Sequence, residues 1–88
     1  MAARVEYKAS VSKDLRKLNR PAAIRLLSKI EKALRLEGQG KALTGDFNGL
    51  YSLRVGDYRV IYVRTDSGFL VLRIGHRRDV YKRGRPTR

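Results

Sequence analysis

The sequence has no cysteine and no tryptophan, and acidic residues are scarce. Without cysteine there is no disulfide framework and no zinc–thiolate site. No apolar run approaches the ~20 residues that span a bilayer, and the N-terminus lacks the apolar stretch of a signal peptide. At 88 residues the chain is too short for two ordinary domains or for a Rossmann or barrel enzyme. We therefore expect one domain over residues 1–88, located in the cytoplasm, with no membrane partner.

Positive charge is abundant: 21 Lys and Arg stand against 8 Asp and Glu, a formal net charge of +13. Arginine outnumbers lysine two to one, and its rigid donor fork matches phosphate geometry. The excess runs along the whole chain and ends in a basic tail from about residue 82. A solvated surface does not need this imbalance, so we expect a polyanionic partner, nucleic acid ahead of a membrane or an acidic protein.

The N-terminal half predicts one strand and two helices. Residues 4–8 alternate polar and apolar, which is typical of a short strand. Ser10 is placed to cap a short helix, Pro21 fits the first position of a second helix, and Gly38 and Gly40 would end that helix. Apolar residues at helical spacing predict its buried stripe: Ile24, Leu27, Ile30 and Leu34, flanked by Ala23, Leu26 and Ala33.

The C-terminal half predicts a sheet. A loop over 41–49 precedes three alternating runs, which predict strands over 50–55, 58–64 and 69–74. The resulting order, β-α-α-β-β-β, indicates an α+β fold in which two helices pack on one face of a small antiparallel sheet.

The Gly56-Asp57 dipeptide is typical of a two-residue type II′ turn, which fixes the pairing of the strands around it. The pairs on the helix-facing side are Val55 with Tyr58, Leu53 with Val60, and Tyr51 with Tyr62. On the other side Arg54 lies directly opposite Arg59. Like charges in such a pair are destabilising, and a local conflict of this kind is expected at functional sites. The alternative is that the two long side chains splay into solvent at little cost.

The next turn predicts where two further arginines lie. A three-residue loop over 66–68, with Gly68 left-handed, pairs Thr65 with Phe69. That register places on the helix-facing side Leu70, Leu72 and Ile74. It places on the side of Arg54 and Arg59 the residues Arg73, Arg77, Ile61, Val63, Phe69 and Val71. The apolar members of that second group form either a partner surface or an ordinary second packing face.

Two segments carry a resemblance. Residues 50–62 (LYSLRVGDYRVIY) contain a Gly-Asp-Tyr-Arg hairpin, and residues 75–81 (GHRRDVY) contain a Gly-x-Arg…Tyr ending. Together they resemble the RelE/ParE superfamily of type II toxin–antitoxin toxins, and most closely its RelE branch. The resemblance covers nearly the whole chain. It implies a compact β-α-α-β-β-β toxin that a cognate antitoxin protein wraps and neutralises.

The RelE branch implies an activity, namely ribosome-dependent cleavage of mRNA that arrests translation. Such an mRNA interferase is a metal-independent endoribonuclease without a cofactor, acting in the A site of a 70S-type ribosome beside rRNA. The substrate's own 2′-hydroxyl attacks the adjacent phosphate and leaves a cyclic phosphate and a free 5′-hydroxyl.

The resemblance also implies roles for individual residues. By position, Arg59 would hold the scissile phosphate, and Arg77 would stabilise transition-state charge or protonate the leaving oxygen. Tyr81 would stack on a codon base, and Arg54 stands where typical RelE toxins carry a catalytic lysine. Further RNA contacts are expected from Arg73, Arg78, Lys82 and Arg83.

The general base is open at this point. Two lysines typical of RelE toxins are replaced by Ser52 and Arg54, and arginine stays protonated. Histidine is the usual base near neutral pH, but strand alternation turns His76 to the core side, where a structural role is expected. Tyr81 is another candidate if the surrounding arginines favour its phenolate.

Two other functions compete with RNA cleavage. One is a ParE-like toxin that inhibits DNA gyrase by binding, although such toxins generally lack the full Arg…Arg…Tyr set. The other is an RNA-binding module without catalytic activity, which the missing lysines favour.

Overall fold

The computed structural model describes residues 3–36 and 40–88, so the predicted helix end at Gly38 lies outside the described residues. In chain order the elements are β1 (Arg4–Tyr7), α1 (Val11–Leu15), α2 (Arg20–Leu36), β2 (Lys41–Ala42), the 3₁₀ helix η1 (Gly45–Phe47), β3 (Tyr51–Val55), β4 (Tyr58–Arg64) and β5 (Gly68–His76).

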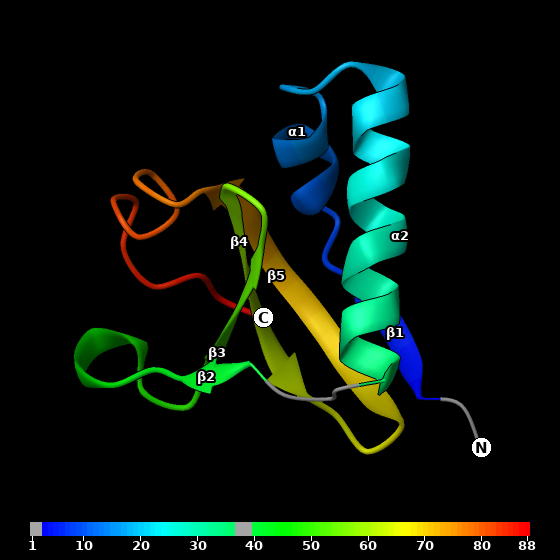
Figure 1. The fold of residues 1–88 in the computed structure, drawn as a ribbon. Helices are drawn as coiled ribbons and strands as arrows, with labels where there is room; N and C mark the ends of the chain where they lie inside the picture. Colours follow the sequence, from blue (N-terminus) through cyan, green and yellow to red (C-terminus); the bar gives the residue numbers. More distant parts are fainter. Residues whose placement is uncertain (1–2, 37–39) are drawn as a thin grey trace.

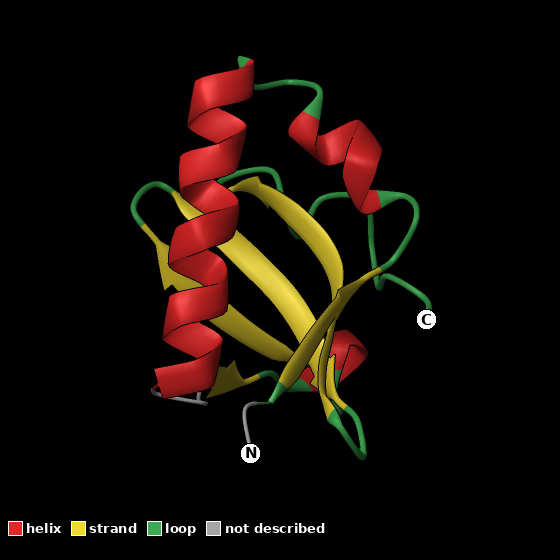
Figure 2. Ribbon diagram, turned by 90° about the vertical axis from the view of Figure 1, so that its right-hand side faces the viewer, coloured by secondary structure: helices red, strands yellow, loops and turns green. Residues whose placement is uncertain are grey.

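The strands form one five-stranded sheet in the order β1-β5-β4-β3-β2. Neighbours run antiparallel except β1, which lies parallel to β5 at the edge. Both helices lie on one side of this sheet (Figures 1 and 2). The α+β architecture predicted from the sequence is confirmed. The structure differs from the prediction in two features. The edge strand β1 runs parallel to its neighbour, and the short strand β2 lies within the stretch predicted as a loop.

Helix starts differ in detail from the prediction. The side-chain Oδ1 of Asn19 accepts a hydrogen bond from the backbone N–H of Ala22 at 2.9 Å, so Asn19 caps α2 and Pro21 is its second residue. Ser10 precedes α1 in a helical backbone conformation, without a side-chain cap bond among the described residues. Pro21 therefore stands one residue later in its helix than predicted, and the side-chain cap predicted for Ser10 is not formed. Nowhere in the described ranges is a helix long and apolar enough to cross a membrane.

The buried stripe of α2 consists of Leu26, Ile30 and Leu34, spaced four residues apart. Ile24, predicted to be buried, is 58% exposed. At about 100° per residue, Ile24 lies roughly 120° around the helix from Ile30, outside the stripe that faces the sheet. The sequence pattern allowed a broad apolar face, and the sheet covers only part of it.

The β3–β4 hairpin has the predicted register. Val55 pairs with Tyr58, Leu53 with Val60, and Tyr51 with Tyr62, so that Arg54 lies directly opposite Arg59. Gly56 occupies the turn with a positive φ of 60°, which glycine adopts without the steric cost of a side chain.

The β4–β5 hairpin has the predicted register in only one half. Ile61 pairs with Arg73 as expected, but a bulge between Ile61 and Tyr62 shifts the pairing beyond it by one residue. Near the turn, Arg64 pairs with Phe69, and Thr65 and Gly68 exchange backbone hydrogen bonds of 2.9 and 3.3 Å around a two-residue turn. The predicted three-residue loop is wrong.

Gly68 closes this turn at the point where β1 pairs with β5. A Cβ at Gly68 would lie 2.1 Å from the carbonyl oxygen of Arg4, so glycine serves the close approach of β1. The bulge then exchanges two pairs of residues between the faces relative to the prediction. Phe69 and Val71 pack in the helix-side core, and Leu70 and Leu72 pack on the other side.

The sheet face opposite the helices is a second core. Leu50, Ile61, Val63, Leu72 and Val80 are buried there. The cover comes from the segment around η1 and from the C-terminal segment after β5, which Figure 1 shows in green and in orange to red on the side away from the helices. Of the predicted apolar group, Ile61 and Val63 therefore belong to an ordinary second packing face, which Leu70 and Leu72 join in place of Phe69 and Val71.

The stripe of α2 makes a testable prediction. Replacing the fully buried Ile30 with alanine should lower the free energy of unfolding by about 2–5 kcal/mol through lost burial and a cavity. The matched change Ile24→Ala on the exposed flank should alter it by no more than about 0.5 kcal/mol. Urea unfolding of both variants measures this difference, and equal losses would contradict the assignment of the buried face.

Candidate functional site

A pocket of about 380 Å³ lies on the sheet face opposite the helices, where β2 joins β3. Four parts of the chain contribute to its wall: the β2 segment, β3, β4 and the turn after β5. The lining residues are Lys41, Ala42, Leu43, Thr44, Ser52, Arg59, Arg77 and Tyr81. Three of the four residues predicted as catalytic therefore line one pocket.

The two arginines of the pocket are positioned by the backbone. Arg59 lies on β4 opposite Gly75 of β5, one pair away from the end of the hairpin. The backbone N–H of Arg77 donates to the carbonyl of Asp57 at 2.9 Å, which extends the pairing by one residue beyond β5. Both arginines line the same pocket, so an anion bound there would meet two cationic residues.

Tyr81 forms another part of the wall. Its hydroxyl donates to Oγ of Ser52 at 3.0 Å. Its ring lies 5.4 Å from that of Phe47 at an interplanar angle of 86°, a favourable edge-to-face arrangement. Ser52 thus accepts the hydrogen bond that positions the tyrosine hydroxyl.

Lys41 is a charged pocket residue that the sequence did not predict as part of the site. It pairs directly with Ser52 across β2 and β3, so both side chains stand on the pocket side. Strand β2 has only two residues, which leaves too little alternation to detect. The usable sign is the Lys41-Ala42-Leu43 run, in which Leu43 packs into the second core.

Gly40, directly before β2, lets the chain approach β3 closely. A Cβ at this position would lie 2.3 Å from the carbonyl oxygen of Ser52. The N–H of Gly40 donates to the hydroxyl of Tyr62, whose ring is fully buried. Burial raises the pKa of the Tyr62 hydroxyl, and this hydrogen bond partly offsets the effect. The buried tyrosine therefore anchors the strand that presents Lys41.

Other predicted site residues lie outside the pocket lining. Arg54 is exposed on β3, with its Nε donating to the carbonyl of Gly56 at 3.5 Å. Arg78 is exposed in the turn after β5. Lys82 is also exposed, and its Nζ lies 3.4 Å from a carboxylate oxygen of Asp79.

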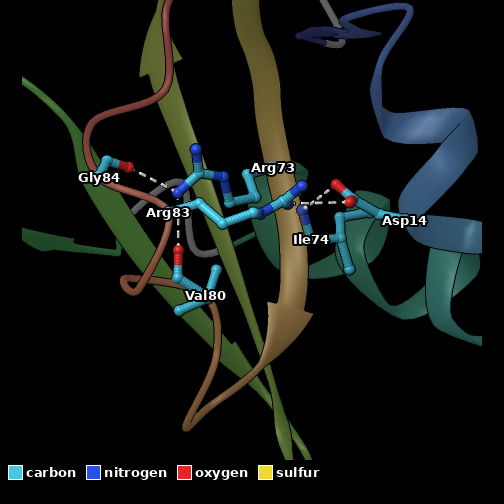
Figure 3. Close-up of polar contacts among 6 residues, drawn as sticks. All are labelled: Asp14, Arg73, Ile74, Val80, Arg83 and Gly84. Atoms are coloured by element: carbon cyan, nitrogen blue, oxygen red, sulfur yellow. Dashed lines mark hydrogen bonds and ion pairs between the residues drawn. The ribbon is translucent and has the colours of Figure 1, made fainter.

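Arg73 and Arg83 are engaged within the protein (Figure 3). Arg73 is only 8% exposed, and its Nη1 donates to the carbonyls of Val80 at 2.8 Å and Gly84 at 2.7 Å. Burial, and then the charge of Arg83, lower the pKa of the Arg73 guanidinium, while Asp14 raises it. Arg83 donates to Oδ1 of Asp14 at 3.2 Å. The structure thus does not bring Arg73 to the accessible surface beside Arg59.

His76 lies on the other side of the sheet from the pocket. It pairs with Tyr58, and the centroids of the two rings are 6.1 Å apart. The Tyr58 side chain packs against the helix-side core. The expected orientation of His76 toward the helix side is confirmed, although the side chain is exposed at the sheet end.

The fold is that of a small toxin of the RelE/ParE superfamily. The family model described as ParE toxin of type II toxin–antitoxin system, parDE, matches residues 5–81. The chain belongs to this ParE toxin family and is a type II toxin. No curated protein matches the sequence.

Solved structures support the same assignment. In the RelBE2 toxin–antitoxin complex of Mycobacterium tuberculosis one chain is 27% identical, with a TM-score of 0.77 over 88% of this chain and 100% of that chain. In the archaeal RelE–RelB complex of Pyrococcus horikoshii OT3 one chain is 30% identical, with a TM-score of 0.64 over 88% of this chain and 97% of that chain. The DinJ–YafQ toxin–antitoxin complex of E. coli shares the fold, with a TM-score of 0.66 at 19% identity over 92% of this chain and 99% of that chain.

The Tyr81–Ser52 hydrogen bond makes a second prediction. Ser52→Ala and Tyr81→Phe should each lower the free energy of unfolding by about 1 kcal/mol, because each removes the same bond. The double variant should lose about as much as either single one. A double-mutant cycle by urea unfolding checks this, and strictly additive losses would show that the bond contributes nothing.

Proposed function

We propose that this type II toxin is a ribosome-dependent mRNA endoribonuclease that arrests translation. The observation that supports the proposal is the pocket in which Arg59, Arg77 and Tyr81 meet on one face of the sheet. Guanidinium groups bind phosphate, and an aromatic ring is the usual means of holding an unpaired base. A single-stranded RNA presents a phosphate next to an unpaired base, so it can bind both kinds of group at once.

The proposed reaction is an internal transfer at phosphorus. The 2′-oxygen of one nucleotide forms a bond to the adjacent phosphorus, and the bond from phosphorus to the 5′-oxygen of the next nucleotide breaks. The products are a 2′,3′-cyclic phosphate and a 5′-hydroxyl, and the proton lost by the 2′-hydroxyl is balanced by one gained by the leaving oxygen. Positioning and charge stabilisation carry most of the catalysis in such reactions, and no metal ion is needed in this scheme.

Each pocket cation has a role in the proposal. Arg59 holds the non-bridging phosphate oxygens, and Arg77 stabilises the charge that develops toward the leaving oxygen or supplies its proton. Lys41 contributes the amine that is absent at position 52, from the strand opposite Ser52. Arg54 extends the positive surface beyond the pocket.

Exposed cations after β5 would contact RNA outside the pocket. Arg78 and Lys82 lie in the turn that follows the strand, and the side chain of Arg83 is 59% exposed despite its ion pair. Phosphate contacts of this kind bring the enzyme to mRNA and to rRNA without reading sequence. Arg73 is better explained as a structural residue because it is buried.

A cognate antitoxin is the proposed protein partner, in the cytoplasm. The similar chains from Mycobacterium tuberculosis and Pyrococcus horikoshii were both solved as toxin–antitoxin complexes. A surface with a formal charge of +13 suits an acidic segment that folds on binding.

A reconstituted translation assay tests the activity. The protein should cut mRNA in ribosomes and leave 2′,3′-cyclic phosphate ends. Arg59→Ala and Arg77→Ala should each lower the single-turnover cleavage rate by about 100-fold or more, because each removes charge stabilisation. Lys41→Gln should lower it by about 10-fold, whereas the exposed helix variants Arg20→Ala and Lys32→Gln should cut at the wild-type rate.

Cleavage that persists in the Arg59→Ala/Arg77→Ala double variant would refute the proposal. Inhibition of purified DNA gyrase without RNA cleavage would replace it with the ParE-like inhibitor. Binding to ribosomes with neither effect would indicate the non-catalytic RNA-binding module.

Cell growth tests the partnership. Induced expression of the protein alone should arrest growth, and co-expression of the small protein encoded next to it should restore growth. The Arg59→Ala/Arg77→Ala variant should be tolerated alone because its pocket lacks both phosphate-binding groups. Normal growth at high levels of the folded wild-type protein would contradict the toxin assignment in that host.

A further inference from the structure

The segment that carries Tyr81 has little regular structure of its own. It follows β5 as a series of turns, held within itself by backbone bonds such as Lys82 N–H to Asp79 carbonyl at 3.1 Å. Something outside the segment must therefore fix it on the sheet, because turns with exposed backbone are otherwise mobile.

Two hydrogen bonds from Arg73 fix both ends of the stretch that contains Tyr81. Nη1 of Arg73 donates to the carbonyl of Val80, directly before Tyr81, and to the carbonyl of Gly84, three residues after it. Val80 is itself 1% exposed in the second core. Because the donor is charged and nearly buried, each bond is worth more than a neutral one at the surface.

Asp14 completes the attachment from the helix side. Strand β1 ends at Tyr7, so within residues 3–36 and 40–88 no strand pairs with this edge of β5 beyond Val71. Oδ2 of Asp14 accepts the backbone N–H of Ile74 at 3.0 Å, and Oδ1 accepts from Arg83 at 3.2 Å. Figure 3 shows the two arginines crossing: Arg73 reaches from β5 to the C-terminal segment, and Arg83 reaches back to Asp14 on α1.

We propose that Arg73 and Asp14 are positioning residues that hold Tyr81 over the substrate pocket. Arg73 bonds the carbonyls of Val80 and Gly84, and Asp14 bonds the N–H of Ile74 and the side chain of Arg83. Both residues act on RNA only through the placement of Tyr81. This inference rests on the proposed function for its effect on cleavage, but the placement of Tyr81 can be measured without RNA.

The experiment compares Arg73→Met, Arg73→Lys and Asp14→Asn with wild type, with Arg20→Met as a matched arginine control on the exposed start of α2. Arg73→Met should lower kcat for ribosome-dependent cleavage by about 10- to 100-fold, since displacing a substrate-orienting group by about 1 Å has effects of this size. KM should stay within about twofold because the pocket cations remain. Arg73→Lys, which keeps the charge and can reach one carbonyl, should recover part of the loss.

A Tyr81→Ala background separates positioning from general stability. There, Arg73→Met and Asp14→Asn should cause no further loss of kcat, because the group they position is gone. The Tyr81 ring lies beside the ring of Phe47. In the absence of RNA, the NMR resonances of the Tyr81 ring should therefore shift in both variants and stay unchanged in Arg20→Met.

Several outcomes would overturn the inference. A folded Arg73→Met protein with wild-type kcat refutes it, and so does an equal loss of kcat with and without Tyr81. If Arg73→Met fails to fold, Asp14→Asn decides by the same readouts, since its amide oxygen can still accept from the N–H of Ile74 while the negative charge and the second acceptor, which binds Arg83, are lost. If the wild type does not cleave RNA, the proposed function fails, and unchanged Tyr81 resonances in the variants would independently refute the positioning role.

Discussion

Strand β4 is buried on both faces, and the rest of the structure depends on this. Val60 and Tyr62 are fully buried toward the helices, and Ile61 is fully buried on the other side. The two helices cover one face only, so the remaining chain must cover the other. The η1 segment and the C-terminal segment do so, and the pocket forms where β2, the sheet and the turn after β5 meet. The hydrophobic effect thus brings Arg77 and Tyr81 to Arg59.

The excess of cations shapes how the C-terminal segment is attached. With 21 basic and 8 acidic residues, carboxylates cannot pair with most of the positive charge. Backbone carbonyls serve instead: Arg73 binds those of Val80 and Gly84, and Arg85 binds those of Asp46 and Asn48 at 3.1 and 2.7 Å. Cations held in this way stabilise the fold, whereas Arg59, Arg77 and Lys41 line the pocket.

The accuracy of the sequence predictions follows from the range of the interactions involved. The β3–β4 register was predicted correctly because a two-residue turn dictates it locally. The β4–β5 register failed beyond Ile61 because a bulge shifts the pairing there by one residue, and the alternation of apolar residues does not record a bulge. Ile24 was misplaced since periodicity shows an apolar face but not how much of it the sheet covers. Lys41 was missed because a two-residue strand exists only through its pairing with β3.

By itself, the sequence determined the α+β element order, the hairpin that sets Arg54 against Arg59, and the resemblance to toxins of the RelE/ParE superfamily. These properties depend on local turn chemistry and on short motifs. The tertiary structure alone decided that Arg73 is buried, that Lys41 joins Arg59 and Arg77, and that Ser52 holds Tyr81. Each of these depends on segments far apart in the chain that meet only when both faces of the sheet are covered, and no local pattern records that contact.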